Sequence, residues 1–149
     1  MMNRTPYSYP ARLEPDEEGR LVVHFPDLPE ALTDGADEAE ALAEASDCLS
    51  TALAARIVNN EDIPLPRRLR RGQYLVAPDA TMALKAALYS ALRARSVAVA
   101  DLARRLGIDE RKAARLMDPR AVSSLTDLEA ALLALGYAVG IEVHERPAA

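Results

Sequence analysis

The sequence has few of the features that would place it outside the cytoplasm. Its single cysteine, Cys48, excludes a disulfide framework within the chain and occupies a position typical of the buried side of a helix. The opening residues contain no apolar run of the kind a signal peptide needs, and charged residues interrupt every apolar segment that could cross a bilayer. We therefore expect a cytoplasmic protein with no membrane partner.

Residues that hold metals or perform catalysis are also scarce. The two histidines, His24 and His144, lie far apart in the sequence, and neither has a cysteine or a carboxylate at ligand spacing. The sequence contains no glycine-rich phosphate loop, no Gly-x-Ser-x-Gly elbow and no His-Glu-x-x-His motif. These absences predict no metal site, no cofactor and no enzymatic activity.

What the sequence does contain is the composition of a soluble globular protein and an uneven distribution of charge. Hydrophobic residues make up 50% of the 149 positions and charged residues 28%, which fits one ordinary domain or two small ones. Residues 1–62 carry 14 acidic and 4 basic side chains, whereas residues 63–149 carry 9 acidic and 14 basic ones. The formal charges of −10 and +5 suggest two modules with different partners.

The acidic half has the pattern of a small sheet with one helix. The segments "YSYPARLEP" and "RLVVHFP" flank the turn "DEEG", which predicts a β-hairpin, and "PDLPEALTDG" leads into at most a short third strand. Apolar residues recur at helical spacing between Asp37 and Asn59, which predicts a long amphipathic helix packed on the hairpin. The segment "QYLVA" is a short candidate strand that could complete this sheet.

A basic linker and a helical region follow. Residues 60–72 combine two prolines with the arginine cluster "RRLRR", which we interpret as an exposed linker that adds non-specific electrostatic affinity for DNA or RNA. After Pro78 the hydrophobic period is helical up to "SLTDLEAALLALG". The closing "AVGIEVHE" alternates and predicts a terminal strand, which either pairs with a second copy of the chain or returns to the helical domain.

The stretch "LARRLGIDERKAARLMD" contains the stop and cap residues expected for two helices joined by a tight turn. Gly107 can adopt the left-handed conformation that ends a helix, and Asp109 is a good N-cap for the next one. Leu102, Ala103 and Leu106 form the inner face of the first helix, and Ala113, Leu116 and Met117 that of the second. The side chains left outside are Glu110, Arg111, Lys112 and Arg115.

These outward cations have two interpretations. Arg111 and Arg115 project side by side and could contact guanine in a major groove, or they could simply be solvated. Two observations favour DNA. Residues 85–120 have a local charge of +5, with Lys85 counted among the cations. A helix also precedes the pair and another follows it, started by a capping box of Ser124 with Asp127 or of Thr126 with Glu129.

The chain resembles a known family over nearly its whole length. The motifs "YP", "EPDEEG", "FPDLPE" and "LTDGADEAEAL" are similar to those of the HicB antitoxins, with departures at Glu30 and Leu32, where many members have Gly and Cys. The region from "LVAPDATMALK" to "EAALLALG" is similar to the helix-turn-helix extension that longer HicB proteins share with Cro/repressor-type regulators.

This resemblance implies an α+β fold in which a partial RNase H-like β-sheet with one long helix precedes an all-α helix-turn-helix domain that ends in a short strand. It implies a toxin-binding domain at residues 1–78, including the linker, and a DNA-binding and dimerisation domain at 79–149. The implied partners are a HicA-like toxin, which is a small basic endoribonuclease, double-stranded operator DNA, and one or three further copies of the chain. By position, Glu110, Arg111 and Arg115 would contact bases, and Lys112 and the helix start near Val99 would face phosphates.

Charge agrees with this division, because an acidic module complements a partner that binds RNA. Asp16, Glu17 and Glu18, in the hairpin connection, are candidates for the rim of the toxin contact, although each could equally be part of a solubilising turn. We therefore expect a non-enzymatic type II antitoxin that neutralises an mRNA interferase and represses its own operon. The alternative is a solitary transcriptional regulator whose first domain senses a ligand or a protein.

Overall fold

The computed structural model describes residues 7–145, which divide into two compact units. The first unit contains the described residues up to Leu53, Pro64–Asp79 and residues 144–145, and the second contains Ala54–Ile63 and Ala80–Val143. The elements, in chain order, are β1 (Tyr9–Pro15), β2 (Leu21–His24), β3 (Leu32–Gly35), α1 (Glu38–Val58), β4 (Tyr74–Val76), α2 (Ala80–Ala94), α3 (Val99–Leu106), α4 (Glu110–Met117) and α5 (Leu125–Ala134). The α+β class expected from the sequence is confirmed.

The first unit is built on an antiparallel sheet of four strands in the order β3-β2-β1-β4. The β1–β2 hairpin pairs Leu13 with Val23, and β3 extends it at one edge. The segment "QYLVA" does return to this sheet, because β4 pairs with β1 at the other edge and places Val76 opposite Tyr9. Tyr9 and Val23 are buried, whereas Arg12, one of the alternate positions of β1, is exposed, so the strands have one core face.

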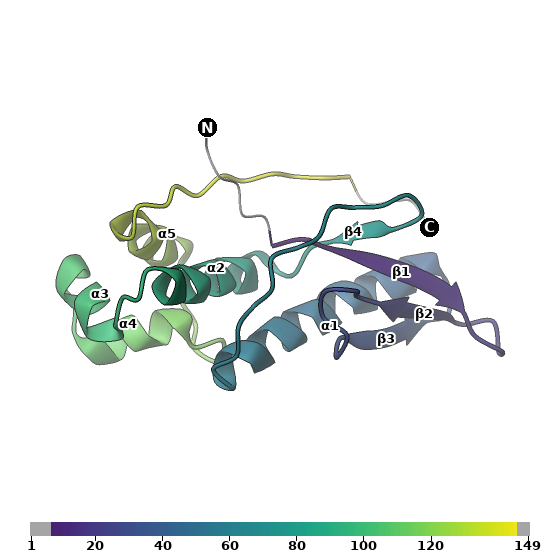
Figure 1. The fold of residues 1–149 in the computed structure, drawn as a ribbon, viewed down its shortest axis with the longest axis horizontal. Helices are drawn as coiled ribbons and strands as arrows, with labels where there is room; N and C mark the ends of the chain where they lie inside the picture. The colour runs from purple at the N-terminus through teal and green to yellow at the C-terminus, as the bar shows by residue number, and fades with distance from the viewer. Residues whose placement is uncertain (1–6, 146–149) are drawn as a thin grey trace. The chain divides into compact units, whose positions relative to one another are not determined.

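Helix α1 runs along one face of this sheet (Figure 1). Its buried residues are small or apolar and fall at helical spacing: Ala41, Ala45, Leu49, Ala52 and Leu53. The helix approaches the sheet closely at Gly35, where an added Cβ would lie 2.3 Å from the backbone nitrogen of Ala41. Only glycine permits this contact between β3 and the first turns of α1.

The basic linker is held against the first unit at its start. The Tyr9 hydroxyl donates a hydrogen bond of 2.7 Å to the Pro64 carbonyl. The Asp27 carboxylate, whose side chain is 4% exposed, accepts from the Arg67 amide at 3.0 Å and pairs with the Arg67 guanidinium at 3.0 Å. The linker that the sequence predicts to be exposed is therefore anchored at Pro64 and Arg67 before it enters β4.

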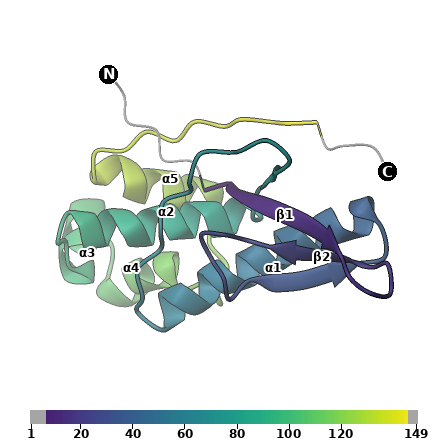
Figure 2. The same ribbon diagram turned by 45° about the vertical axis from the view of Figure 1, so that its right-hand side comes forward.

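The second unit is a cluster of helices around one apolar core, with α3 packed on α4 and α2 packed on both α4 and α5 (Figure 2). Every helix from α2 to α5 contributes side chains to this core. Its fully or nearly fully buried members are Leu88, Ala91, Leu92, Leu102, Leu116, Leu128, Ala131, Leu132 and Leu135.

The predicted terminal strand is wrong for the residues that the structure describes. Residues 137–145 have no regular secondary structure and pair with no strand of the described chain. Ile141 is 78% exposed and Val143 89% exposed. The alternation of apolar residues gives a segment two faces, but a strand also needs a neighbouring strand for its backbone hydrogen bonds, and a local pattern cannot provide one.

Candidate functional site

Two short helices joined by a tight turn form the most distinctive local unit. Gly107 ends α3 with φ 66° and ψ 33°, and its amide donates to carbonyls of the last turn of α3. Asp109 caps α4 and accepts from the Lys112 amide at 2.7 Å. Both predictions of turn chemistry are confirmed. The following helix, α5, begins at the first of the two candidate caps, because the Ser124 hydroxyl is its N-cap and accepts from the Asp127 amide at 3.0 Å.

The outward face of α4 carries the charged residues expected from its spacing. Ala113 and Leu116 are buried, and Met117 is half-buried against the core. Glu110, Arg111, Lys112 and Arg115 are all exposed. Within residues 7–145, the side chains of Arg111, Lys112 and Arg115 form no hydrogen bond or ion pair, so their donors remain available to a ligand.

Most other cations of the predicted basic patch are already engaged. Arg93 donates to the Asp62 carboxylate at 2.6 and 3.0 Å and lies 5.2 Å from the centre of the Tyr89 ring. Arg95 stacks over Tyr137 at 4.8 Å. Arg104 pairs with Asp101, and Arg120 pairs with Asp118 at 3.1 Å. The local charge of +5 over residues 85–120 suggests a broad basic patch. In the structure, the free positive charge of the helical unit is concentrated on α4.

Lys85 does not belong to this patch. It lies on the buried side of α2 with 1% of its surface exposed, although the sequence count placed it among the phosphate-binding cations. Burial lowers the pKa of its ammonium, while the charge of the Asp118 carboxylate acts in the opposite direction. A signal was present in the sequence, because Lys85 stands between Met82 and Tyr89 at the spacing of the apolar face of α2.

The start of α3 has unoccupied backbone donors. Val99, the first residue of this helix, is half-buried, and the preceding residue, Ala98, is an N-cap without a side-chain hydrogen bond. The first amides of a helix lack intrahelical acceptors and carry the positive end of its dipole. The chemistry at Val99 is therefore compatible with the expected phosphate contact.

The acidic hairpin connection separates into one structural residue and two free ones. Asp16 accepts hydrogen bonds of 2.9 Å from the amides of Glu18 and Arg20, so its carboxylate closes the turn between β1 and β2. Glu17 and Glu18 are exposed, and their side chains have no partner among the described residues. Glu17 and Glu18 are thus the better candidates for contact with a basic partner.

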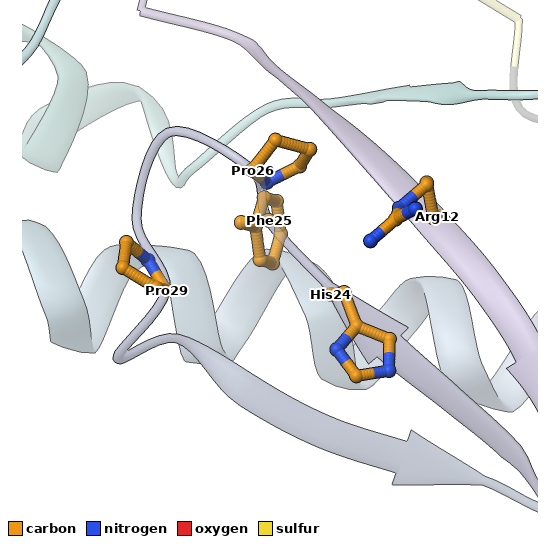
Figure 3. Close-up of a pocket in the computed structure, with 5 residues that line it drawn as sticks. All are labelled: Arg12, His24, Phe25, Pro26 and Pro29. Atoms are coloured by element: carbon orange, nitrogen blue, oxygen red, sulfur yellow. The ribbon is translucent and has the colours of Figure 1, made fainter.

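A shallow pocket of about 160 Å³ opens on the first unit. Its lining consists of Arg12, His24, Phe25, Pro26 and Pro29. Figure 3 shows Arg12 and His24 on neighbouring strands, and the strand register pairs these two residues directly. The pocket combines a guanidinium and an imidazole with apolar rings and offers no carboxylate.

The basic linker turn presents further arginines. Arg70 and Gln73 close the turn before β4, with the Gln73 side-chain oxygen accepting from the Arg70 amide at 2.8 Å. Arg68 and Arg71 are exposed and have no partner within the described part of the chain. Because Asp27 binds Arg67, the backbone at the start of this turn is anchored, and the cationic side chains that follow project from it into solvent.

Among residues 7–145, no group of three or more histidine, cysteine, aspartate or glutamate side chains is placed to hold a metal ion. None of the helices described is both long and apolar enough to span a bilayer.

Comparison with known proteins gives one consistent result. Residues 8–87 match a family model described as the HicB_like antitoxin of a bacterial toxin-antitoxin system. The chain is 35% identical over 136 residues to Antitoxin HicB 1 of Photorhabdus laumondii subsp. laumondii, covering 91% of this chain and 86% of that protein. It is 35% identical over 128 residues to Antitoxin HicB of Escherichia coli strain K12, covering 86% of this chain and 93% of that protein. These alignments extend well beyond the region of the family model.

Proposed function

The chain belongs to the HicB-like antitoxin family of bacterial toxin-antitoxin systems, and from this membership we propose that it binds and neutralises a HicA-like mRNA interferase and represses its own operon. We assign toxin binding to residues 1–78 and operator binding and self-association to residues 79–149. The protein performs both tasks by binding alone, without catalysis and without a cofactor, in the cytoplasm.

The observation that carries the DNA-binding proposal is the outward face of α4. Arg111 and Arg115 are exposed, four residues apart, and free of partners among residues 7–145. The helix that presents them is short, capped by Asp109 and fixed to α3 by the Gly107 turn. A rigid helix with adjacent free guanidinium groups suits hydrogen bonding to guanine edges in a major groove. Lys112 and the α3 amino end near Val99 then meet phosphates, and Glu110 meets a base edge.

Replacement of Arg111 and Arg115 by alanine tests this proposal. Each lost base contact should cost about 1–3 kcal/mol of binding free energy and relax the preference for the operator over other sequences. The measurement is a fluorescence anisotropy titration of the DNA upstream of the gene and of a scrambled duplex of equal length.

The matched control is the replacement of Arg93 and Arg95, which are engaged with Asp62 and Tyr137, by alanine. This double variant removes the same charge from the same unit and should retain sequence preference. Equal sequence preference in the wild type and the Arg111/Arg115 variant would exclude α4 as the reading helix.

The toxin-binding proposal is supported by the charge of the first module. Residues 1–62 carry a formal charge of −10, and Glu17 and Glu18 are exposed and unpaired within the described residues. A toxin that binds RNA must have a basic surface, and an acidic surface would complement it. The free carboxylates of the hairpin turn form part of the contact rim.

Charge reversal at the hairpin turn tests this second contact. Glu17→Lys and Glu18→Lys together should slow association with the co-expressed neighbouring toxin and weaken the salt dependence of its binding, because rim charges act mainly on the association rate. Glu129→Lys, on α5, is the control for each single hairpin variant, because it makes the same charge change as Glu17→Lys or Glu18→Lys alone. If the control and the hairpin variant have the same association rate, the turn lies outside the contact.

Co-purification of the chain with the product of the neighbouring gene separates the proposed function from that of a solitary regulator. A small basic histidine-containing protein that copurifies and whose RNA cleavage is blocked by the chain supports the antitoxin function. A chain that binds its upstream DNA and has no such neighbour would be a solitary regulator.

A further inference from the structure

Lys85 is a buried cation on a helix face that is otherwise apolar. Its neighbours on the buried side of α2 are Met82, Ala86, Leu88 and Tyr89. Removing an ammonium from water is costly, and proteins often gain stability when an apolar side chain replaces a buried charge. Packing of the core alone therefore does not explain a lysine at this position.

The acceptors around Lys85 all belong to the end of α4 and the segment that leaves it. The ammonium donates to the carbonyl of Asp118 at 2.6 Å, of Ala121 at 2.8 Å and of Arg115 at 3.2 Å. The Ser123 hydroxyl lies 3.1 Å away and itself donates to the Arg115 carbonyl at 3.4 Å. The Lys85 ammonium thus forms hydrogen bonds with the last turn of α4, with the turn that follows it and with the residue that precedes the N-cap of α5.

The position of this charge matches the electrostatics of the helix end. The last carbonyls of a helix lack intrahelical donors and carry the negative end of the dipole, so a cation there is favourable. Arg115 connects the two sides of α4, because its carbonyl is bound by Lys85 while its side chain is exposed and free. The Lys85 ammonium, together with the Asp118 amide and the Ser123 hydroxyl, therefore holds the backbone from which the Arg115 guanidinium projects.

We propose that Lys85 is a positioning residue for DNA recognition, which fixes the carboxyl end of α4 on α2 so that Arg115 is presented in one geometry. This inference rests on the proposed operator binding. Bidentate recognition of a base requires side chains held within about 0.5 Å of the productive geometry. Lys85 ties the carbonyls of Arg115, Asp118 and Ala121 to α2. Lys85 itself does not touch DNA.

The test compares wild-type protein with Lys85→Met, which keeps the length of the side chain and removes its donors. The full-length chain is titrated against the duplex upstream of its gene and against a scrambled duplex. We expect the ratio of the two affinities to fall about tenfold, as for the loss of one base contact, while affinity for the scrambled duplex is unchanged. Partial unfolding would lower both affinities equally and leave the ratio as it is.

Leu92→Ala is the matched control. Leu92 lies on the same helix, seven residues further along, in the same core, and the substitution destabilises the unit without removing a donor from α4. The control should keep the wild-type affinity ratio at a temperature where both variants are folded. An affinity ratio in Lys85→Met equal to that of the wild type would overturn the inference. Lys85→Leu, which also removes the donors, undergoes the same test if Lys85→Met does not fold.

Amide hydrogen exchange provides a readout that does not depend on DNA. The Asp118 and Ala121 amides donate within the segment held by Lys85, so their protection should fall in Lys85→Met and not in Leu92→Ala. Unchanged protection would overturn the positioning role. If the wild-type protein does not distinguish the two duplexes, the proposed operator binding fails, and the exchange data alone then decide whether Lys85 positions α4.

Discussion

Lys85 and Arg115 are both cations of the helical unit, yet their surroundings give them opposite roles. Lys85 is 1% exposed and donates to backbone carbonyls, whereas Arg115 is exposed and its guanidinium has no partner among residues 7–145. Charge alone does not separate them in the sequence. Each residue's place on its helix does, because Lys85 shares a face with Met82 and Tyr89 while Arg115 lies opposite Ala113 and Leu116.

Asp118 allows a prediction on acid stability. The Arg120 amide at 2.9 Å and the Arg120 guanidinium at 3.1 Å hold the pKa of the Asp118 carboxyl below its ordinary value of about 3.9. The unfolded chain therefore binds this proton first, and the stabilisation is complete above about pH 3.9 and is lost as the pH falls through the folded-state pKa. Asp118→Asn should show a smaller loss of unfolding free energy on acidification, measured by urea denaturation from pH 6 downward. If the unfolding free energies of the two proteins fall in parallel as the pH is lowered, the Asp118 carboxylate contributes nothing to the acid sensitivity.

At the scale of elements, the predictions of capping and turn residues are confirmed, because the hydrogen bonds of these residues are local. Gly107, Asp109 and Ser124 act within three or four residues of their own positions, so the sequence shows both partners at once. The hairpin and α1 were also recognisable, since period two and period 3.6 can be counted along the chain. The prediction of a terminal strand was wrong, because a strand needs a neighbouring strand, and the alternation of residues within one short segment does not show whether one is present.

The turn between α3 and α4 gives a prediction with a built-in control. Gly107 has φ 66°, and nothing lies within 4 Å of an added Cβ, so Gly107→Ala should destabilise the helical unit by about 1 kcal/mol through backbone strain alone. Gly140→Ala also adds a methyl group into open space, at a position without positive φ, and should change stability little. Thermal and urea denaturation measure both. Equal midpoints for the two variants would contradict the strain argument.

At the scale of the molecule, the contrast between an acidic and a basic half has a structural counterpart in each unit. The first unit exposes Glu17 and Glu18 at its hairpin turn, and the second exposes Arg111 and Arg115 on α4. The division is not complete, because Arg68 and Arg71 extend from the sheet unit on a turn anchored by Asp27. These arginines would add sequence-independent affinity for phosphates to the operator contact.

The proposed self-association leads to a prediction about the operator. A two-fold symmetric protein that presents one α4 from each copy places its reading helices about 34 Å apart on one side of the duplex. The operator should therefore contain an inverted repeat with half-sites roughly 10 base pairs apart, or a multiple of this spacing. Footprinting of the upstream DNA, with insertions of five and ten base pairs between the half-sites, measures the spacing. Protection of one asymmetric half-site would argue against a symmetric dimer on DNA.

By itself, the sequence determined the α+β class, the order of the elements, the caps of α4 and α5, and the outward face of α4, because each depends on residue periods or on neighbours along the chain. Only the tertiary structure decided which distant groups engage the cations of the helical unit. Arg93 and Asp62 are 31 residues apart, and Lys85 and Asp118 are 33 apart, so no local pattern shows these pairings. Long-range burial and ion pairing arise when distant segments of the chain meet. They leave Arg111, Lys112 and Arg115 of α4 as free cations and bury Lys85 against the end of the same helix.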